Sequence, residues 1–154
     1  MKKSINMWLD EYAESHQNKI NKLIHWVCVP LITFTLLGLL SLITYDFKTY
    51  NIDLASILIA IAIIFYIRLS KSLAIGMLFF STMCIFILSK LKTMMPDSSL
   101  INLYTIVFIV SWIGQFVGHK IEGKKPSFIK DIQFLLIGPV WLLSFIYKKL
   151  NIPI

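Results

Sequence analysis

Charged residues are scarce in this chain of 154 residues, and their scarcity excludes the common classes of soluble protein. Asp, Glu, Lys and Arg together make up 15% of the sequence, hydrophobic residues make up 57%, and the mean hydropathy is +0.76. Ordinary soluble domains have about 25% charged and roughly 45–50% apolar residues. The composition therefore predicts an integral membrane protein in contact with the lipid bilayer. The short length predicts a single membrane-embedded domain over residues 1–154.

Several motifs of catalysis and binding are also missing. The sequence has no Gly-rich phosphate loop, no nucleophile elbow and no HExxH zinc motif. Its two cysteines, Cys28 and Cys84, lie inside apolar stretches without CxxC spacing, so we expect buried thiols rather than a disulfide or a zinc pair. The net charge of +7 comes from lysines that flank apolar stretches without interleaved aromatic residues. We therefore expect no binding of nucleic acid.

Five apolar stretches follow one another and are candidates to cross the bilayer. They cover residues 23–44, 54–69, 73–88, 100–117 and 129–147, and a straight crossing takes roughly 20 residues. The second and third are short and nearly contiguous around Ser70, which predicts a tight helical hairpin. The fifth contains Gly138-Pro139, so it either crosses with a kink or returns to the side where it entered. The sequence thus predicts an all-α fold, a polytopic membrane helical bundle of four to five transmembrane helices.

The segment before the first span has the pattern of an amphipathic helix. Its apolar residues follow helical spacing and share one face with His16; they are Ile5, Trp8, Leu9 and Tyr12. We expect an N-terminal interfacial amphipathic helix that turns His16 toward the bundle.

The distribution of Lys and Arg predicts the orientation, because basic residues are retained on the cytoplasmic side. With five crossings, ten lie on one side (Lys2, Lys3, Lys19, Lys22, Arg68, Lys71, Lys120, Lys124, Lys125 and Lys130) and five on the other (Lys48, Lys90, Lys92, Lys148 and Lys149). A re-entrant last segment makes the ratio twelve to three. We expect a cytoplasmic amino terminus, and the Lys/Ile-rich composition favours a bacterial inner membrane.

The chain has three histidines, His16, His25 and His119, each at the edge of an apolar segment. The predicted topology places all three on the cytoplasmic side, although the histidines took no part in the count. His16 and His25 are nine residues apart, so on one continuous helix at about 100° per residue they point in opposite directions. We therefore expect a break between them, at Gln17-Asn18 or at Asn21, because Asn starts helices well.

Polar residues accompany the histidines at helical spacing. Gln115, His119 and Glu122 stack on one face if the fourth span continues past residue 118, and Asn21 shares a face with His25. Neutral imidazole suits iron, zinc and copper, and a few histidines with a carboxylate and open positions are typical of non-haem iron that handles dioxygen. Glu122 and Asn21 are candidates to bind the metal or to orient its ligands.

Two other interpretations of these residues stay open. Each histidine alone is compatible with packing or hydrogen bonding at the membrane interface. Lys120, Lys124 and Lys125 are candidates to hold a fatty-acid carboxylate or a lipid phosphate, or they are simply residues retained on the cytoplasmic side.

The two histidine-containing stretches resemble the Mpo-like family of small membrane proteins, whose yeast member is a 2-hydroxy fatty acid dioxygenase. The residues that match are Tyr12, His16, Asn21, His25 and Pro30 in the first stretch, and Gln115-Phe116-Val117-Gly118-His119, Glu122, Lys124-Lys125-Pro126, Asp131 and Gly138-Pro139 in the second. The chain departs from the yeast-type pattern at Gln17, where that pattern has a second histidine, and at Phe145, where it has an acidic residue.

This resemblance implies an Fe(II)-dependent dioxygenase of fatty-acid α-oxidation that shortens a 2-hydroxy fatty acid by one carbon. His16, His25 and His119 would then be iron ligands, with Glu122 as their partner in the catalytic site. Asn21, Gln115, Lys120 and Lys124 would contact the substrate or support the ligands. The alternative is a non-catalytic lipid-binding or structural membrane protein that holds a lipid headgroup at the same place.

Overall fold

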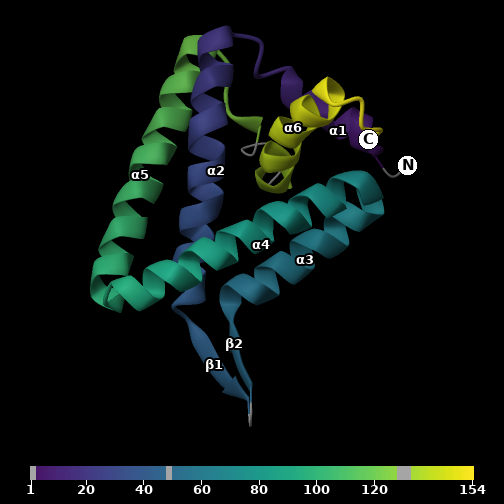
Figure 1. Ribbon diagram of the computed structural model, residues 1–154. Helices are drawn as coiled ribbons and strands as arrows, with labels where there is room; N and C mark the ends of the chain where they lie inside the picture. The colour runs from purple at the N-terminus through teal and green to yellow at the C-terminus, as the bar shows by residue number, and fades with distance from the viewer. Residues whose placement is uncertain (1–2, 48–49, 128–132) are drawn as a thin grey trace.

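The computed structural model describes residues 3–47, 50–127 and 133–154 and is almost entirely helical. In chain order the elements are α1 (Ile5–Ala13), α2 (Lys19–Ser41), β1 (Thr44–Phe47), β2 (Tyr50–Asp53), α3 (Leu54–Leu69), α4 (Lys71–Met94), α5 (Asp97–Glu122) and α6 (Phe134–Lys149) (Figure 1). The all-α prediction is confirmed, with the addition of a short antiparallel hairpin in which Thr44 pairs with Asp53. This hairpin projects beyond the helices and was not predicted.

Three of the described helices, α2, α4 and α5, are long and apolar enough to cross a bilayer. The helix α3 is a shorter apolar helix of 16 residues. The tight hairpin between α3 and α4 is confirmed: Ser70 lies between the two helices, and its hydroxyl accepts a hydrogen bond from the Leu73 N–H at 3.3 Å. The fourth predicted span continues past Gly118 and ends at Glu122, because Gly123 takes a left-handed conformation with φ 72°.

The fifth predicted span corresponds to α6, which begins at Phe134 and contains Pro139. Its predicted start at Ile129 lies outside the described residues. So do Asp131 of the family pattern and three lysines of the charge count, Lys2, Lys48 and Lys130.

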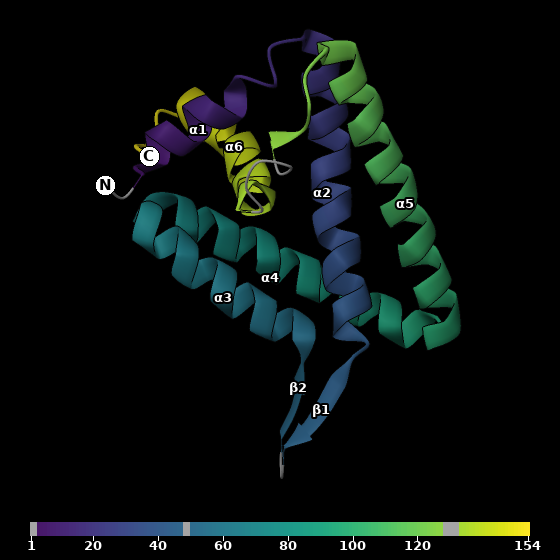
Figure 2. The same ribbon diagram turned by 180° about the vertical axis from the view of Figure 1, so that it is seen from behind.

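The helices α2 and α5 lie side by side along most of their length and make the most extensive helix contact in the structure (Figure 2). Two glycines of α5 allow this approach, since a Cβ at Gly114 would lie 2.7 Å from the Cys28 sulfur and a Cβ at Gly118 would collide with Asn21 Oδ1. The pairing brings the C-terminal end of α5, which carries His119, beside the start of α2, which carries His25.

The helix α1 packs its apolar face on α6. The four residues predicted to share that face, Ile5, Trp8, Leu9 and Tyr12, are all buried, and the Trp8 and Phe134 rings meet edge to face with centroids 5.1 Å apart. Protein therefore covers the apolar face of α1, and its last residues lead directly to His16. Both cysteines have free thiols in the described structure, with Cys84 buried and Cys28 half-buried.

Candidate metal centre

His16 lies in the break between α1 and α2. The helix α1 ends at Ala13, and α2 starts after Asn18, whose side chain accepts hydrogen bonds from the N–H groups of Ile20 at 2.8 Å and Asn21 at 3.4 Å. The break predicted at Gln17-Asn18 is thus confirmed, with Asn18 as the cap. It directs His16 into the protein, where its side chain is fully buried.

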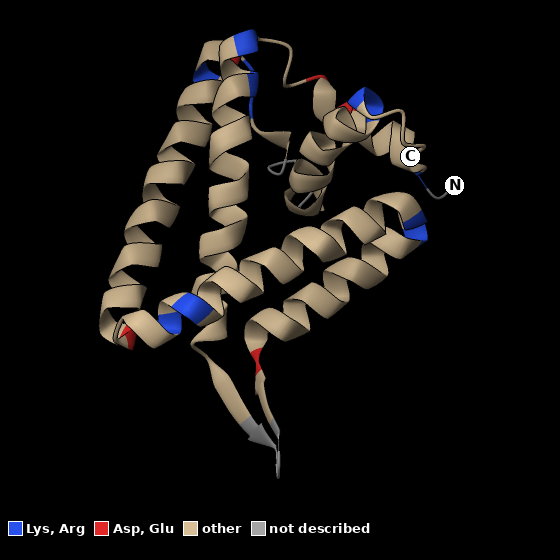
Figure 3. Ribbon diagram, viewed as in Figure 1, with Lys and Arg blue, Asp and Glu red and all other residues tan. Residues whose placement is uncertain are grey.

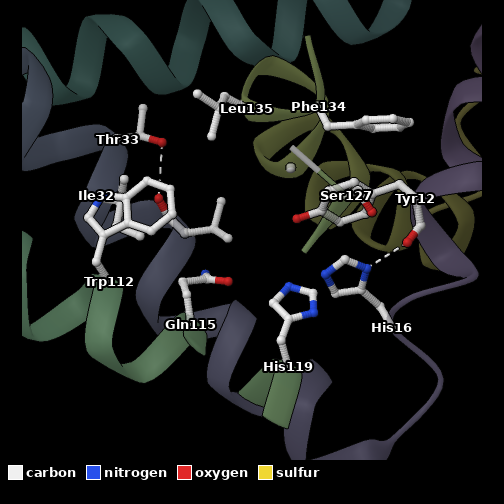
Figure 4. Close-up of a pocket in the computed structure, with 12 residues that line it drawn as sticks. Tyr12, His16, Ile32, Thr33, Trp112, Gln115, His119, Ser127, Phe134 and Leu135 are labelled. Atoms are coloured by element: carbon white, nitrogen blue, oxygen red, sulfur yellow. Dashed lines mark hydrogen bonds between the residues drawn. The ribbon is translucent and has the colours of Figure 1, made fainter. Parts of the chain in front are cut away.

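All three histidines meet at one point. One nitrogen from each of His16, His25 and His119 lies within 4.8 Å of the others, and all three residues are buried. The ring centroid of His16 is 4.3 Å from that of His25 and 4.8 Å from that of His119. Figure 4 shows His16 and His119 turned toward the same cavity from different elements. The convergence of the histidines that the sequence predicted is therefore present in the structure.

Hydrogen bonds fix which nitrogen of two imidazoles carries a proton. His16 Nδ1 lies 2.5 Å from the Tyr12 carbonyl oxygen, and His25 Nδ1 lies 2.9 Å from the Asn21 carbonyl oxygen. A carbonyl oxygen only accepts, so both Nδ1 atoms donate, and each neutral ring has its lone pair on Nε2. These two Nε2 atoms face each other at 2.9 Å. Two lone pairs at that distance repel each other, and a cation bound to both nitrogens would remove the repulsion.

The distance between the Nε2 atoms of His16 and His25 fits two bonds to one divalent metal ion. Metal–imidazole bonds are about 2.0–2.1 Å long, so two nitrogens at roughly a right angle on one metal are about 3 Å apart. His119 Nδ1 is buried and has no hydrogen-bond partner within the described residues, so this nitrogen is a candidate metal ligand. The Nδ1 donors of His16 and His25 to backbone carbonyls are the supporting hydrogen bonds that metal-binding histidines usually make.

The surroundings keep His16 neutral and fixed. Burial, together with the neighbouring His25, lowers the pKa of His16 to about 3, so that the ring is in its metal-binding form at neutral pH. The Tyr12 ring stacks on His16 with centroids 4.1 Å apart and planes at 9°. Burial also raises the pKa of Tyr12 far above its usual value, so the phenol stays protonated.

Glu122 does not join the three nitrogens. Its carboxylate accepts hydrogen bonds from the backbone N–H groups of Gln17 and Asn18, each at 2.8 Å, and from the Asn21 side chain at 3.0 Å. This carboxylate therefore fastens the end of α5 to the loop that carries His16. The same Asn21 amide also donates to the Ser15 carbonyl at 3.2 Å.

The other polar residues predicted for the site separate into two groups. Gln115 is 5% exposed and lines the cavity with His16 and His119, and its Nε2 has no hydrogen-bond partner in the described part of the chain. Lys124 instead donates to the Glu14 carbonyl at 2.7 Å, and Lys120 is exposed. Neither lysine lines the cavity.

The cavity itself has a volume of about 50 Å³ and has both polar and apolar walls. Its lining consists of Tyr12, His16, Val29, Ile32, Thr33, Trp112, Gln115, His119, Ser127, Phe134, Leu135 and Gly138. Ser127, whose hydroxyl lies 2.7 Å from that of Ser15, had no signal in the sequence because no helical spacing connects it to the histidines. Tyr12 did have one, since it shares a helix face with His16.

Comparison with known proteins identifies the family of the chain. The family model described as "2-hydroxy-palmitic acid dioxygenase Mpo1-like" matches residues 2–150. A protein of Saccharomyces cerevisiae named 2-hydroxy-palmitic acid dioxygenase MPO1 is 31% identical over 143 residues, which cover 89% of this chain and 76% of the yeast protein. No solved structure matches the chain. The family match covers nearly the whole chain, the three histidines included, and the chain therefore belongs to the Mpo1-like family.

Proposed function

We propose that this protein is an Fe(II)-dependent dioxygenase that shortens a 2-hydroxy fatty acid by one carbon. The observation that carries the proposal is the buried group of His16, His25 and His119, with two Nε2 lone pairs 2.9 Å apart. The name of the yeast relative supports the choice of substrate and reaction. Imidazole ligands suit iron, and iron with open positions is a common catalyst of reactions with dioxygen.

The overall reaction balances without a further reductant. A 2-hydroxy acid and one molecule of dioxygen give an acid one carbon shorter, carbon dioxide and water. The C1–C2 bond breaks, and the substrate supplies all four electrons that dioxygen takes up. Bound Fe(II) would allow dioxygen to react with the substrate through one-electron steps. The carbonyls of Tyr12 and Asn21 hold two of the imidazoles in the required tautomer.

An amphiphilic substrate fits the two kinds of wall in the cavity. His16, His119 and Gln115 belong to the polar part, and residues such as Ile32, Trp112 and Leu135 form the apolar part. A second cavity of about 150 Å³ lies between α2, α4 and α6 and has an almost wholly apolar lining. Val29 lines both cavities. We place the polar head at the histidines and the acyl chain along the apolar walls, toward the second cavity.

The membrane arrangement belongs to the same proposal. Basic residues cluster where α2 begins and α5 ends, which is also where the histidines lie (Figure 3); they are Lys19, Lys22, Lys120, Lys124 and Lys125. This supports a site at the cytoplasmic face, with α1 at the membrane surface and four to five crossings in a bacterial inner membrane. The substrate would enter from the lipid, and dioxygen, which is apolar, would dissolve there too.

Metal analysis of protein purified without oxygen tests this function. We expect about one iron per chain in the wild type, loss of iron in His25→Ala and His119→Ala, and oxygen-dependent formation of the acid with one carbon fewer in the wild type alone. Protein that stays free of iron after incubation with Fe(II), but retains bound lipid, would instead identify a non-catalytic lipid-binding protein.

A further inference from the structure

The side chain of Gln115 is buried, and its Nε2 atom has no hydrogen-bond partner among the residues that the structure describes. Leaving a buried donor unpaired costs about 1–3 kcal/mol, and most buried polar groups in folded proteins are paired. Gln115 lies on the helix face of His119, one turn earlier on α5. Its unpaired amide therefore faces the same cavity as the histidines.

Two hydroxyl groups that also line the cavity, those of Thr33 and Ser127, already have partners. The Thr33 hydroxyl donates to the Val29 carbonyl at 3.0 Å, and the Ser127 hydroxyl is paired with that of Ser15. Figure 4 shows Gln115 between Trp112 and Ile32 on one side and His119 on the other. The amide thus stands where the polar part of the cavity meets the apolar part. Among residues 3–47, 50–127 and 133–154, no Lys or Arg lines the cavity.

We propose that Gln115 is the residue that recognises the head group, by donating a hydrogen bond from Nε2 to a carboxylate oxygen of the bound 2-hydroxy acid. This inference rests on the proposed function for the identity of the ligand. Recognition depends on an amide donor beside the histidines, and not on the lysines at the cytoplasmic end of the bundle. Hydrogen bonds to charged groups are stronger than those between neutral groups, so this donor favours the free acid over its ester.

The test measures binding rather than turnover. Protein in lipid nanodiscs is titrated without oxygen with 2-hydroxyhexadecanoic acid and, separately, with its methyl ester, and binding is followed by tryptophan fluorescence, since Trp112 lines the cavity. We expect Gln115→Leu to lower affinity for the acid about tenfold or more and affinity for the ester much less. Gln115→Glu, which keeps the shape but places a carboxylate against the ligand, should weaken acid binding at least as much.

Two controls separate this inference from other effects. Asn102→Leu replaces an exposed amide side chain of the same helix that does not line the cavity, and it should bind the acid like the wild type. Iron content is measured in parallel and should be unchanged in both Gln115 variants. Folded Gln115→Leu and Gln115→Glu proteins that bind the acid within twofold of wild type would overturn the proposal. If the wild-type protein binds no iron but the Gln115→Leu variant still loses acid binding, the proposed function is overturned and this inference stands.

Discussion

His16 Nε2 and His25 Nε2 face each other at 2.9 Å, although both atoms are hydrogen-bond acceptors. The Nδ1–H groups of His16 and His25 donate hydrogen bonds to the carbonyls of Tyr12 and Asn21. Neither imidazole can therefore turn an N–H toward the other without losing a buried hydrogen bond. The fold thus holds two lone pairs together at the cost of repulsion. A bound cation converts that repulsion into attraction.

Metal removal should therefore destabilise the protein. A metal present at about 100 times its dissociation constant contributes about 2.7 kcal/mol to stability, which for a chain of this size corresponds to roughly 5–10 °C in Tm. We expect the wild type with Fe(II) to melt higher by this amount than the same protein treated with a chelator, as measured by thermal unfolding in detergent. His25→Ala should melt at one temperature with or without Fe(II). Equal melting temperatures for wild type in the two conditions would contradict a metal site.

Glu122 should affect metal binding without being a ligand. Its carboxylate accepts three hydrogen bonds from the loop and helix start that carry His16 and His25, so Glu122→Ala should loosen the position of His16. Loss of such supporting groups typically lowers metal affinity about 10–100-fold. We expect this loss in Glu122→Ala and a smaller one in Glu122→Gln, measured by Fe(II) titration.

The matched control for Glu122 is Glu11→Ala, which removes a carboxylate that pairs with Lys3 near the surface. It should leave Fe(II) affinity unchanged. A Glu122→Ala protein that is folded and binds iron as tightly as the wild type would show that the carboxylate does not position the site.

Local spacing predicted much of this site from the sequence. The separation of His16 and His25 required a break, Asn18 was among the residues expected to supply it, and the spacing of Gln115 and His119 placed them on one helix face. The direction of the Glu122 side chain was not predictable, because it depends on how α5 docks beside the loop at Gln17. The coverage of α1 by α6 was missed for a similar reason: an apolar helix face looks the same in sequence whether protein or lipid covers it.

Gly118 should be intolerant of side chains, because a Cβ there collides with the buried Asn21 side chain. Overpacking of this kind typically costs about 1–3 kcal/mol. Since Asn21 also binds Glu122 and its carbonyl holds His25, we expect Gly118→Ala to lower both Tm and iron content. Val117→Ala, at an exposed position of the same helix, serves as the control and should change neither. Normal iron content and Tm in Gly118→Ala would show that α2 and α5 can separate without disturbing the site.

Met77 should influence the length of the acyl chain that the protein accepts. It is buried on α4 and lines only the second, apolar cavity, away from the histidines. Met77→Trp adds bulk to that cavity, so long 2-hydroxy acids should bind more weakly while short ones and iron bind as in the wild type. Met83→Trp is the matched control, because Met83 is 44% exposed on the same helix and lines neither cavity. Affinities for a series of 2-hydroxy acids from short to long chains would be compared between the two variants. A uniform loss across all lengths would indicate general damage to packing, and no change at any length would place the acyl chain outside the second cavity.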